Sequence, residues 1–198
     1  MTLHSIDFPV IMYGKLLDVR SYHPGGTPKL KGRQGSPTGL IIPYDQWVES
    51  STKRTTIICA GEKDMAVARS NGLNAITLTG GEMAKPLFLA PFRDRNVVIC
   101  YDNDEAGLKG ATQLATQLTG VANSVRVCTK FHEGMENKED ITDYFTKYNH
   151  TKEDLVKCIK ATELFVPPPA EKPELPEWTL LEASKPEHIG VLCKTNIQ

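Results

Sequence analysis

The sequence has no long apolar run and almost no net charge. No stretch approaches the roughly 18 to 20 consecutive apolar residues that a membrane-spanning helix needs. The N-terminus also lacks the charged, apolar and small-residue segments of a secretory signal, so we expect a cytoplasmic protein. The formal charge of −1 over 198 residues provides no general attraction to nucleic acid, and any such binding therefore has to be local.

Two kinds of motif are also missing. None of the five cysteines is spaced as Cys-x-x-Cys, which excludes a zinc module of the usual pattern. Cys59, Cys100 and Cys128 fall inside predicted strands, so we expect reduced thiols in the core. No Gly-x-x-x-x-Gly-Lys-Ser/Thr segment occurs, and the chain therefore contains no helicase motor of the P-loop type.

Two segments, residues 55–64 and 96–107, each combine an apolar run with an acidic turn. The apolar runs are rich in β-branched residues and do not alternate, which is typical of strands buried on both faces of a parallel sheet. A helical pattern follows each run, so the acidic residues lie where strand becomes helix. Ligands of open α/β sheets bind at that edge. Carboxylates gathered there repel one another unless a cation such as Mg²⁺ lies between them.

The remaining pattern of residues 54–165 completes an α/β domain. We predict helices at 63–71, 104–119, from 140 onward and at 151–162, and further strands at 74–79 and 124–129. Thr151 suits the N-cap of the last helix. The expected fold is a parallel, Rossmann-like sheet with helices on both faces.

A small β-rich subdomain is predicted at residues 1–53, with strands at 8–13, 16–22 and 39–44. Residues 23–37 between the last two are too rich in glycine and proline for a helix or a central strand. This basic loop carries Lys29, Lys31 and Arg33, and Arg20 lies at its base. These cations suit phosphate oxygens of a nucleic acid or a triphosphate. An ordinary solvated loop is the alternative.

The composition changes after residue 165. Residues 166–177 are rich in proline and predict a stiff linker. We interpret residues 166–198 as this linker followed by the beginning of another module.

Four segments together resemble the Toprim domain of bacterial and phage primases, topoisomerases and some nucleases. They are an apolar strand followed by Gly61-Glu-Lys-Asp64, the strand and glycines of residues 74–81, Asp102-Asn-Asp-Glu-Ala-Gly107, and residues 140–145. The first and last segments are most similar to phage primases and primase-helicases. The resemblance covers about half of the chain, from residue 54 to residue 148.

The resemblance implies a Mg²⁺- or Mn²⁺-dependent primase that synthesises RNA primers. Its implied partners are a single-stranded DNA template, nucleoside triphosphates, and a replicative helicase or further modules of the same protein. Asp102 and Asp104 would hold the metal, with Asp140 or Asp143 assisting. Glu62 would act with Asp102 and Asp104 in catalysis. Implied contacts to nucleic acid or phosphate come from these basic residues: Arg20, Lys29, Lys31, Arg33 and Lys63.

One position departs from the family pattern. Ala60 stands where the family has a glutamate that is usually assigned the acid/base role, and Glu62 is two residues further on. Two alternatives therefore stay open: a Toprim nuclease with the same acidic cluster, and a non-catalytic Toprim module of a larger replication protein. For Asp104, Asp140 and Asp143, helix capping is the structural alternative to metal binding.

Overall fold

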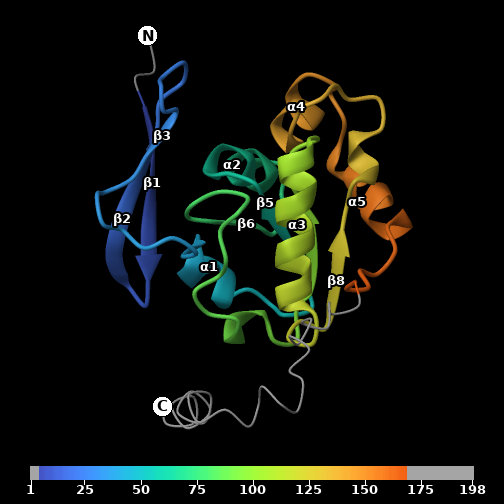
Figure 1. Ribbon diagram of the computed structural model, residues 1–198, viewed down its shortest axis with the longest axis horizontal. Helices are drawn as coiled ribbons and strands as arrows, with labels where there is room; N and C mark the ends of the chain where they lie inside the picture. The colour runs from blue at the N-terminus through green and yellow to red at the C-terminus, as the bar shows by residue number, and fades with distance from the viewer. Residues whose placement is uncertain (1–4, 169–198) are drawn as a thin grey trace, which may run out of the picture. The chain divides into compact units, whose positions relative to one another are not determined.

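The computed structural model describes residues 5–168 (Figure 1). These residues form two sheets, with strand orders β1-β2-β3 and β4-β6-β5-β7-β8. The predicted α/β class with a preceding β-rich segment is confirmed. The elements are, in chain order, β1 (Ile6–Met12), β2 (Lys15–Tyr22), β3 (Leu30–Lys31), β4 (Ile41–Ile42), α1 (Tyr44–Val48), β5 (Thr56–Cys59), α2 (Glu62–Ser70), β6 (Ala75–Leu78), η1 (Ala90–Phe92), β7 (Asn96–Cys100), α3 (Glu105–Leu118), β8 (Ser124–Val127), η2 (Lys130–His132), α4 (Ile141–Thr146) and α5 (Lys152–Ala161).

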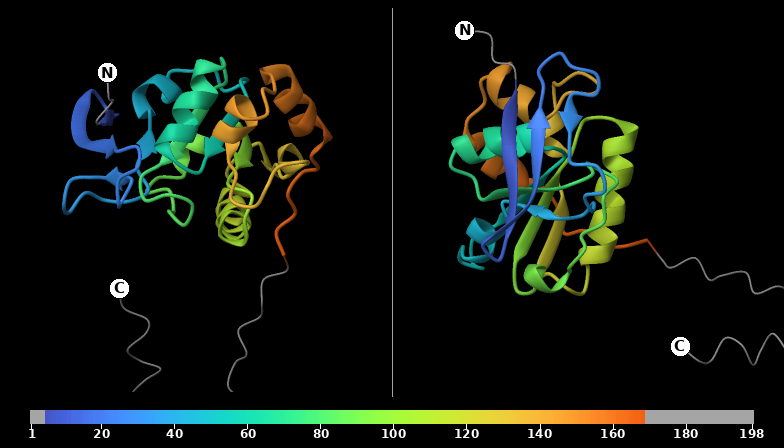
Figure 2. Two further views of the ribbon diagram at one scale, coloured as in Figure 1. Left: turned by 90° about the horizontal axis from the view of Figure 1, so that it is seen from above. Right: turned by 90° about the vertical axis from the view of Figure 1, so that its left-hand side faces the viewer.

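The five-stranded sheet is parallel except for its edge strand β4. Strands β5, β6, β7 and β8 pair in parallel, and every residue of β5 and β6 is buried. Figure 2 shows α3 on one face of this sheet and α2 and α5 on the other. Since β5 leads to β6 on one side and β7 leads to β8 on the other, the strand order reverses between β5 and β7. Ligands of doubly wound sheets bind at such a reversal.

The predicted strand at residues 39–44 differs from the structure. Only Ile41 and Ile42 are extended, and they pair antiparallel with β6 in the large sheet. Pro43, which has no N–H group for a sheet ladder, ends the strand and occupies the N-cap position of helix α1. Helix α1 was not predicted from the sequence. Its residue Trp47 is fully buried. The segment before residue 54 thus contributes directly to the sheet that follows.

The three-stranded sheet packs on the rest of the fold through one face of β1. Phe8, Val10 and Met12 alternate with exposed residues and belong to the same hydrophobic cluster as the large sheet. The carboxylate of Asp45 in α1 accepts hydrogen bonds from the backbone N–H groups of Tyr13, at 2.7 Å, and Gly14, at 2.8 Å. The β1–β2 turn is therefore attached to α1.

Further expectations concern thiols, membrane helices and the C-terminal segment. Cys59, Cys100, Cys128 and Cys158 are free thiols, and the first three are buried, as predicted. None of the helices in residues 5–168 is long and apolar enough to cross a membrane. The predicted linker and module at 166–198 lie outside the described residues from residue 169 onward.

Candidate functional site

Three carboxylates converge at the edge of the large sheet where the strand order reverses. Asp64 lies in the first turn of α2, Asp102 follows β7, and Asp140 is the N-cap of α4. One ligand oxygen from each lies within 4.8 Å of the other two. Because Cys59 and Cys100 are paired at the ends of β5 and β7, the chain leaves both strands at the same edge. We call these three residues the acidic cluster.

Asp102 lies against the backbone of α3. A Cβ atom on Gly107 would be 2.4 Å from the Asp102 carbonyl oxygen, so only glycine permits this close approach. Within residues 5–168, the Asp102 Oδ1 atom is buried and has no hydrogen-bond partner. Burial, followed by the charges of Glu82, Asp64 and Asp140, raises the pKa of Asp102 to about 8. A buried, unpartnered carboxylate oxygen is suited to a cation ligand.

Asp64 and Asp140 share a cation from the chain itself. The Lys63 ammonium lies 2.6 Å from Asp140 Oδ2 and 3.5 Å from Asp64 Oδ1. Burial opposes the charge of Lys63, but the two carboxylates outweigh it and raise its pKa. Burial and the charge of Asp140 raise the pKa of Asp64 to about 6, although Thr142 Oγ1 donates a hydrogen bond to it at 2.6 Å. Lys63, expected to contact phosphate, thus contacts two carboxylates of the acidic cluster.

Asp104 and Asp143, both predicted as metal ligands, cap helices. Asp104 is the N-cap of α3, and its Oδ1 accepts the Gly107 N–H at 2.7 Å. Asp143 and Asp140 form a reciprocal capping box at the start of α4, with donor–acceptor distances of 3.0 and 3.2 Å. Asp140 uses Oδ1 for this cap and Oδ2 for Lys63. Of the four predicted ligands, Asp102 and Asp140 lie in the acidic cluster.

Glu62, the expected catalytic glutamate, is buried at the beginning of α2. Its Oε1 lies 3.1 Å from Nε of Arg20 in β2. This ion pair connects β2 of the three-stranded sheet to helix α2. Arg20, predicted to contact phosphate, thus contacts a carboxylate. Ala60, at the end of β5, is 8% exposed.

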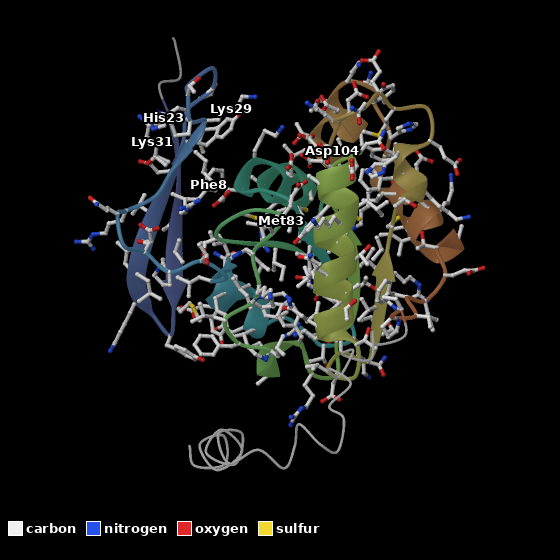
Figure 3. The ribbon with its side chains drawn as sticks, in the orientation of Figure 1. Phe8, His23, Lys29, Lys31, Met83 and Asp104 are labelled. Carbon is white, nitrogen blue, oxygen red and sulfur yellow. The ribbon has the colours of Figure 1, made fainter. Side chains whose placement is uncertain are left out.

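The basic loop leaves its cations available. The side chains of Lys29, Lys31 and Arg33 make no ion pair within residues 5–168, and Figure 3 places Lys29 and Lys31 at the same end of the fold as Asp104. The backbone N–H of Arg33 donates to Asp18 Oδ1 at 3.0 Å, which anchors the loop on β2. The loop thus presents unpaired positive charge from a fixed base.

Two acidic residues at this edge were not among the predicted ligands. Asp64 is the last residue of the Gly-x-x-Asp pattern, which follows a buried strand and here places Asp64 in the first turn of α2. Glu82, in the loop after β6, has Oε1 3.4 Å from the backbone nitrogen of Asp102. No local pattern indicates this contact, because it joins residues 20 positions apart.

One family model and one curated relative are similar to parts of this chain. Residues 57–145 match a family model described as Toprim-like. The DNA primase of Campylobacter jejuni is 38% identical over 69 residues, which cover 34% of this chain and 11% of that protein.

Two solved structures share the fold. The zinc-binding and RNA polymerase domains of the Aquifex aeolicus primase match with a TM-score of 0.62 and 17% identity, covering 82% of this chain and 41% of that one. The primase fragment of the bacteriophage T7 primase-helicase protein matches with a TM-score of 0.52 and 14% identity, covering 78% and 62%. The chain spans less than two thirds of the length of each of these proteins. Residues 57–145 of this chain therefore match a Toprim-like family model, within a fold shared with DNA primases.

Proposed function

We propose that this chain is the catalytic core of a phage-type DNA primase, which joins ribonucleotides into a primer on single-stranded DNA in the cytoplasm. The observation that carries the proposal is the acidic cluster, Asp64, Asp102 and Asp140, whose ligand atoms lie within 4.8 Å of one another at the strand-order reversal. A replicative helicase, or a further module of the same protein, is the partner that this function implies.

The donor set fits a divalent cation with oxygen ligands. All three side chains are carboxylates, which suit Mg²⁺ or Mn²⁺ rather than softer metals. The unpartnered Asp102 Oδ1 offers a ligand atom that no protein group satisfies within the described fold. When bound, the cation would neutralise triphosphate charge and stabilise the charge that develops during nucleotidyl transfer.

In this proposal, different residues of the chain bind phosphate, neutralise carboxylates and position the site. Lys29, Lys31 and Arg33 of the basic loop bind phosphates of the template or the triphosphate, because they are cationic and make no ion pair within the described residues. Lys63 neutralises Asp140 and Asp64, which leaves Asp102 as the carboxylate of the cluster that no cation of the described residues pairs with. The buried Arg20–Glu62 pair favours a positioning role for Glu62 over the acid/base role expected from the sequence.

A primer-synthesis assay tests the proposal. The chain is incubated with single-stranded DNA and labelled ribonucleotides, with and without Mg²⁺, and the products are separated by length. Template-dependent extension that requires Mg²⁺ and is lost in Asp102→Asn supports a primase. Degradation of the DNA with the same requirements would instead identify a nuclease.

Ala60 favours a second candidate, a non-catalytic module that retains the cation site. In the family pattern a glutamate stands at this position, and Ala60 provides no carboxylate. The variant Ala60→Glu separates the two candidates in the same assay. We expect weak activity in the natural sequence and at least about tenfold more in the variant, since a misplaced catalytic group costs on the order of a hundredfold. No extension by either protein, with Mn²⁺ still bound, would identify the non-catalytic module.

A further inference from the structure

The loop that follows β6 brings another acidic side chain, Glu82, next to Asp102. Glu82 accepts the backbone N–H of Asp102 through Oε1 at 3.4 Å. The carboxyl groups of Glu82 and Asp102 are both partly buried, and neighbouring carboxylates repel each other when both are ionised. A divalent cation between them would remove that repulsion.

The position of Glu82 is set by the packing of its loop. A Cβ atom on Gly110 would lie 2.5 Å from the Glu82 carbonyl oxygen, so the loop backbone rests directly on α3 where only glycine permits it. Since β5 lies between β6 and β7, this loop has to pass the carboxyl end of β5 to reach Asp102. Ala60, which has a short side chain, directly follows β5 at that edge.

The positively charged side chains of the described residues pair with neither Glu82 nor Asp102. Lys63 pairs with Asp140 and Asp64. The described residues include no ion pair to Glu82 or Asp102, and Asp102 Oδ1 has no partner there. The negative charge that Lys63 does not neutralise is thus concentrated between Glu82 and Asp102.

We propose that Glu82 is a ligand of the divalent-cation site, with Asp102 and on the side of the cluster away from Lys63. This inference rests on the cation site of the proposed function and adds a residue to it. The ligand is a hard divalent cation such as Mg²⁺ or Mn²⁺, because both donors are carboxylate oxygens. The loop after β6 is then part of the site, although its residues are far from the strand that supplies Asp102.

Titration of the whole chain with Mn²⁺ alone tests this assignment, by calorimetry or by the electron paramagnetic resonance signal of free Mn²⁺. Glu82→Gln keeps an oxygen that accepts the Asp102 N–H and removes the charge. We expect Mn²⁺ affinity to fall at least about tenfold, the loss typical of a disturbed metal shell. Glu105→Gln is the matched control, because Glu105 is an exposed acid in the first turn of α3. Its affinity should stay within twofold of the natural protein.

A third variant separates the two proposals. If Asp102→Asn loses Mn²⁺ binding while Glu82→Gln keeps it, Glu82 is not a ligand and the cation site stands. If the natural chain binds no Mn²⁺, or Asp102→Asn binds as tightly as the natural chain, both assignments are overturned.

Paramagnetic broadening in the natural protein gives a result that does not depend on the folding of a variant. Substoichiometric Mn²⁺ should broaden the amide signals of Gly81, Glu82 and Met83 together with those of Asn103 and Asp104. Equal intensities in the 81–83 segment with and without Mn²⁺, while the signals near Asp102 broaden, would contradict the assignment.

Discussion

Asp102 is harder to ionise than Asp64 in the acidic cluster. Burial and neighbouring carboxylates raise its pKa to about 8, compared with about 6 for Asp64. A carboxyl group whose pKa is raised on folding destabilises the fold as pH rises from its unfolded pKa, about 4, to its folded pKa. Ionisation of Asp102 in the metal-free protein therefore costs stability between about pH 4 and pH 8.

Asp102→Asn should remove this cost. In the absence of divalent cations, we expect the variant to equal the natural protein at pH 4 and to be more stable at pH 9. The difference should be about 1 to 2 kcal/mol, because solvent screening reduces the full electrostatic value. Urea unfolding at the two pH values measures it. Asp104→Asn is the control, since asparagine also caps helices well. An effect of Asp102→Asn on stability that does not change with pH would disprove the raised pKa of Asp102.

The ion pair of Arg20 and Glu62 gives a second prediction at this scale. Glu62 is 3% exposed, so Arg20→Met leaves a buried carboxylate without its cation and should destabilise the fold strongly. Adding Glu62→Gln should recover part of the loss. A double-mutant cycle in urea should give a coupling energy of about 1 to 3 kcal/mol. A coupling near zero would show that the two side chains do not interact in solution.

At the scale of single elements, the contribution of the basic loop to DNA binding can be tested by replacing its cations. Its three cations, Lys29, Lys31 and Arg33, make no ion pair within residues 5–168, so replacing all three with glutamine should preserve the fold. We expect weaker binding to single-stranded DNA and a shallower salt dependence. The slope of log K against log salt should fall by about 2, since each phosphate contact to a single strand contributes about 0.7.

A matched triple variant controls for total charge. Lys53, Lys157 and Lys160 are exposed and lie outside the basic loop. Replacing them with glutamine removes the same charge and should leave the salt slope unchanged. Equal losses in the two triple variants, measured by fluorescence anisotropy over a salt series, would mean that the loop makes no specific contribution.

On the scale of the whole molecule, the three-stranded sheet should unfold together with the large sheet. Strand β1 contributes Phe8, Val10 and Met12 to the shared hydrophobic cluster, and the Asp45 carboxylate holds the β1–β2 turn. Separate unfolding would expose these surfaces before the large sheet opens. We therefore expect one cooperative transition.

Native-state hydrogen exchange in low urea measures this cooperativity. The opening free energies measured at the amides of β1 and β2 should equal those measured at the amides of β5 and β7. Asp45→Asn weakens the attachment of the turn and should lower protection in β1 and β2 first. Earlier opening of the three-stranded sheet in the natural protein would mean that its packing contributes little.

The sequence alone determined the elements whose cause is local. The apolar runs before Gly61 and Asp102 are buried strands because their β-branched residues suit the interior of a parallel sheet. The acidic turns follow these strands at one edge because parallel strands end on the same side. Asp102 was therefore expected at this edge. Asp140 was expected there only from the resemblance to the Toprim family, and Asp64 belonged to the Gly-x-x-Asp pattern without being predicted as a ligand.

Tertiary structure decided the contacts between distant segments. The pairing of Ile41–Ile42 with β6, the contact of Glu82 with Asp102, and the pairing of Lys63 with Asp140 join residues 20 or more positions apart. Charge type alone did not separate Asp102 from Asp104, which caps α3, because both follow the same strand. Carboxylates cap helices and bind cations through the same oxygens, and only the positions of their neighbours in the fold distinguish the two roles.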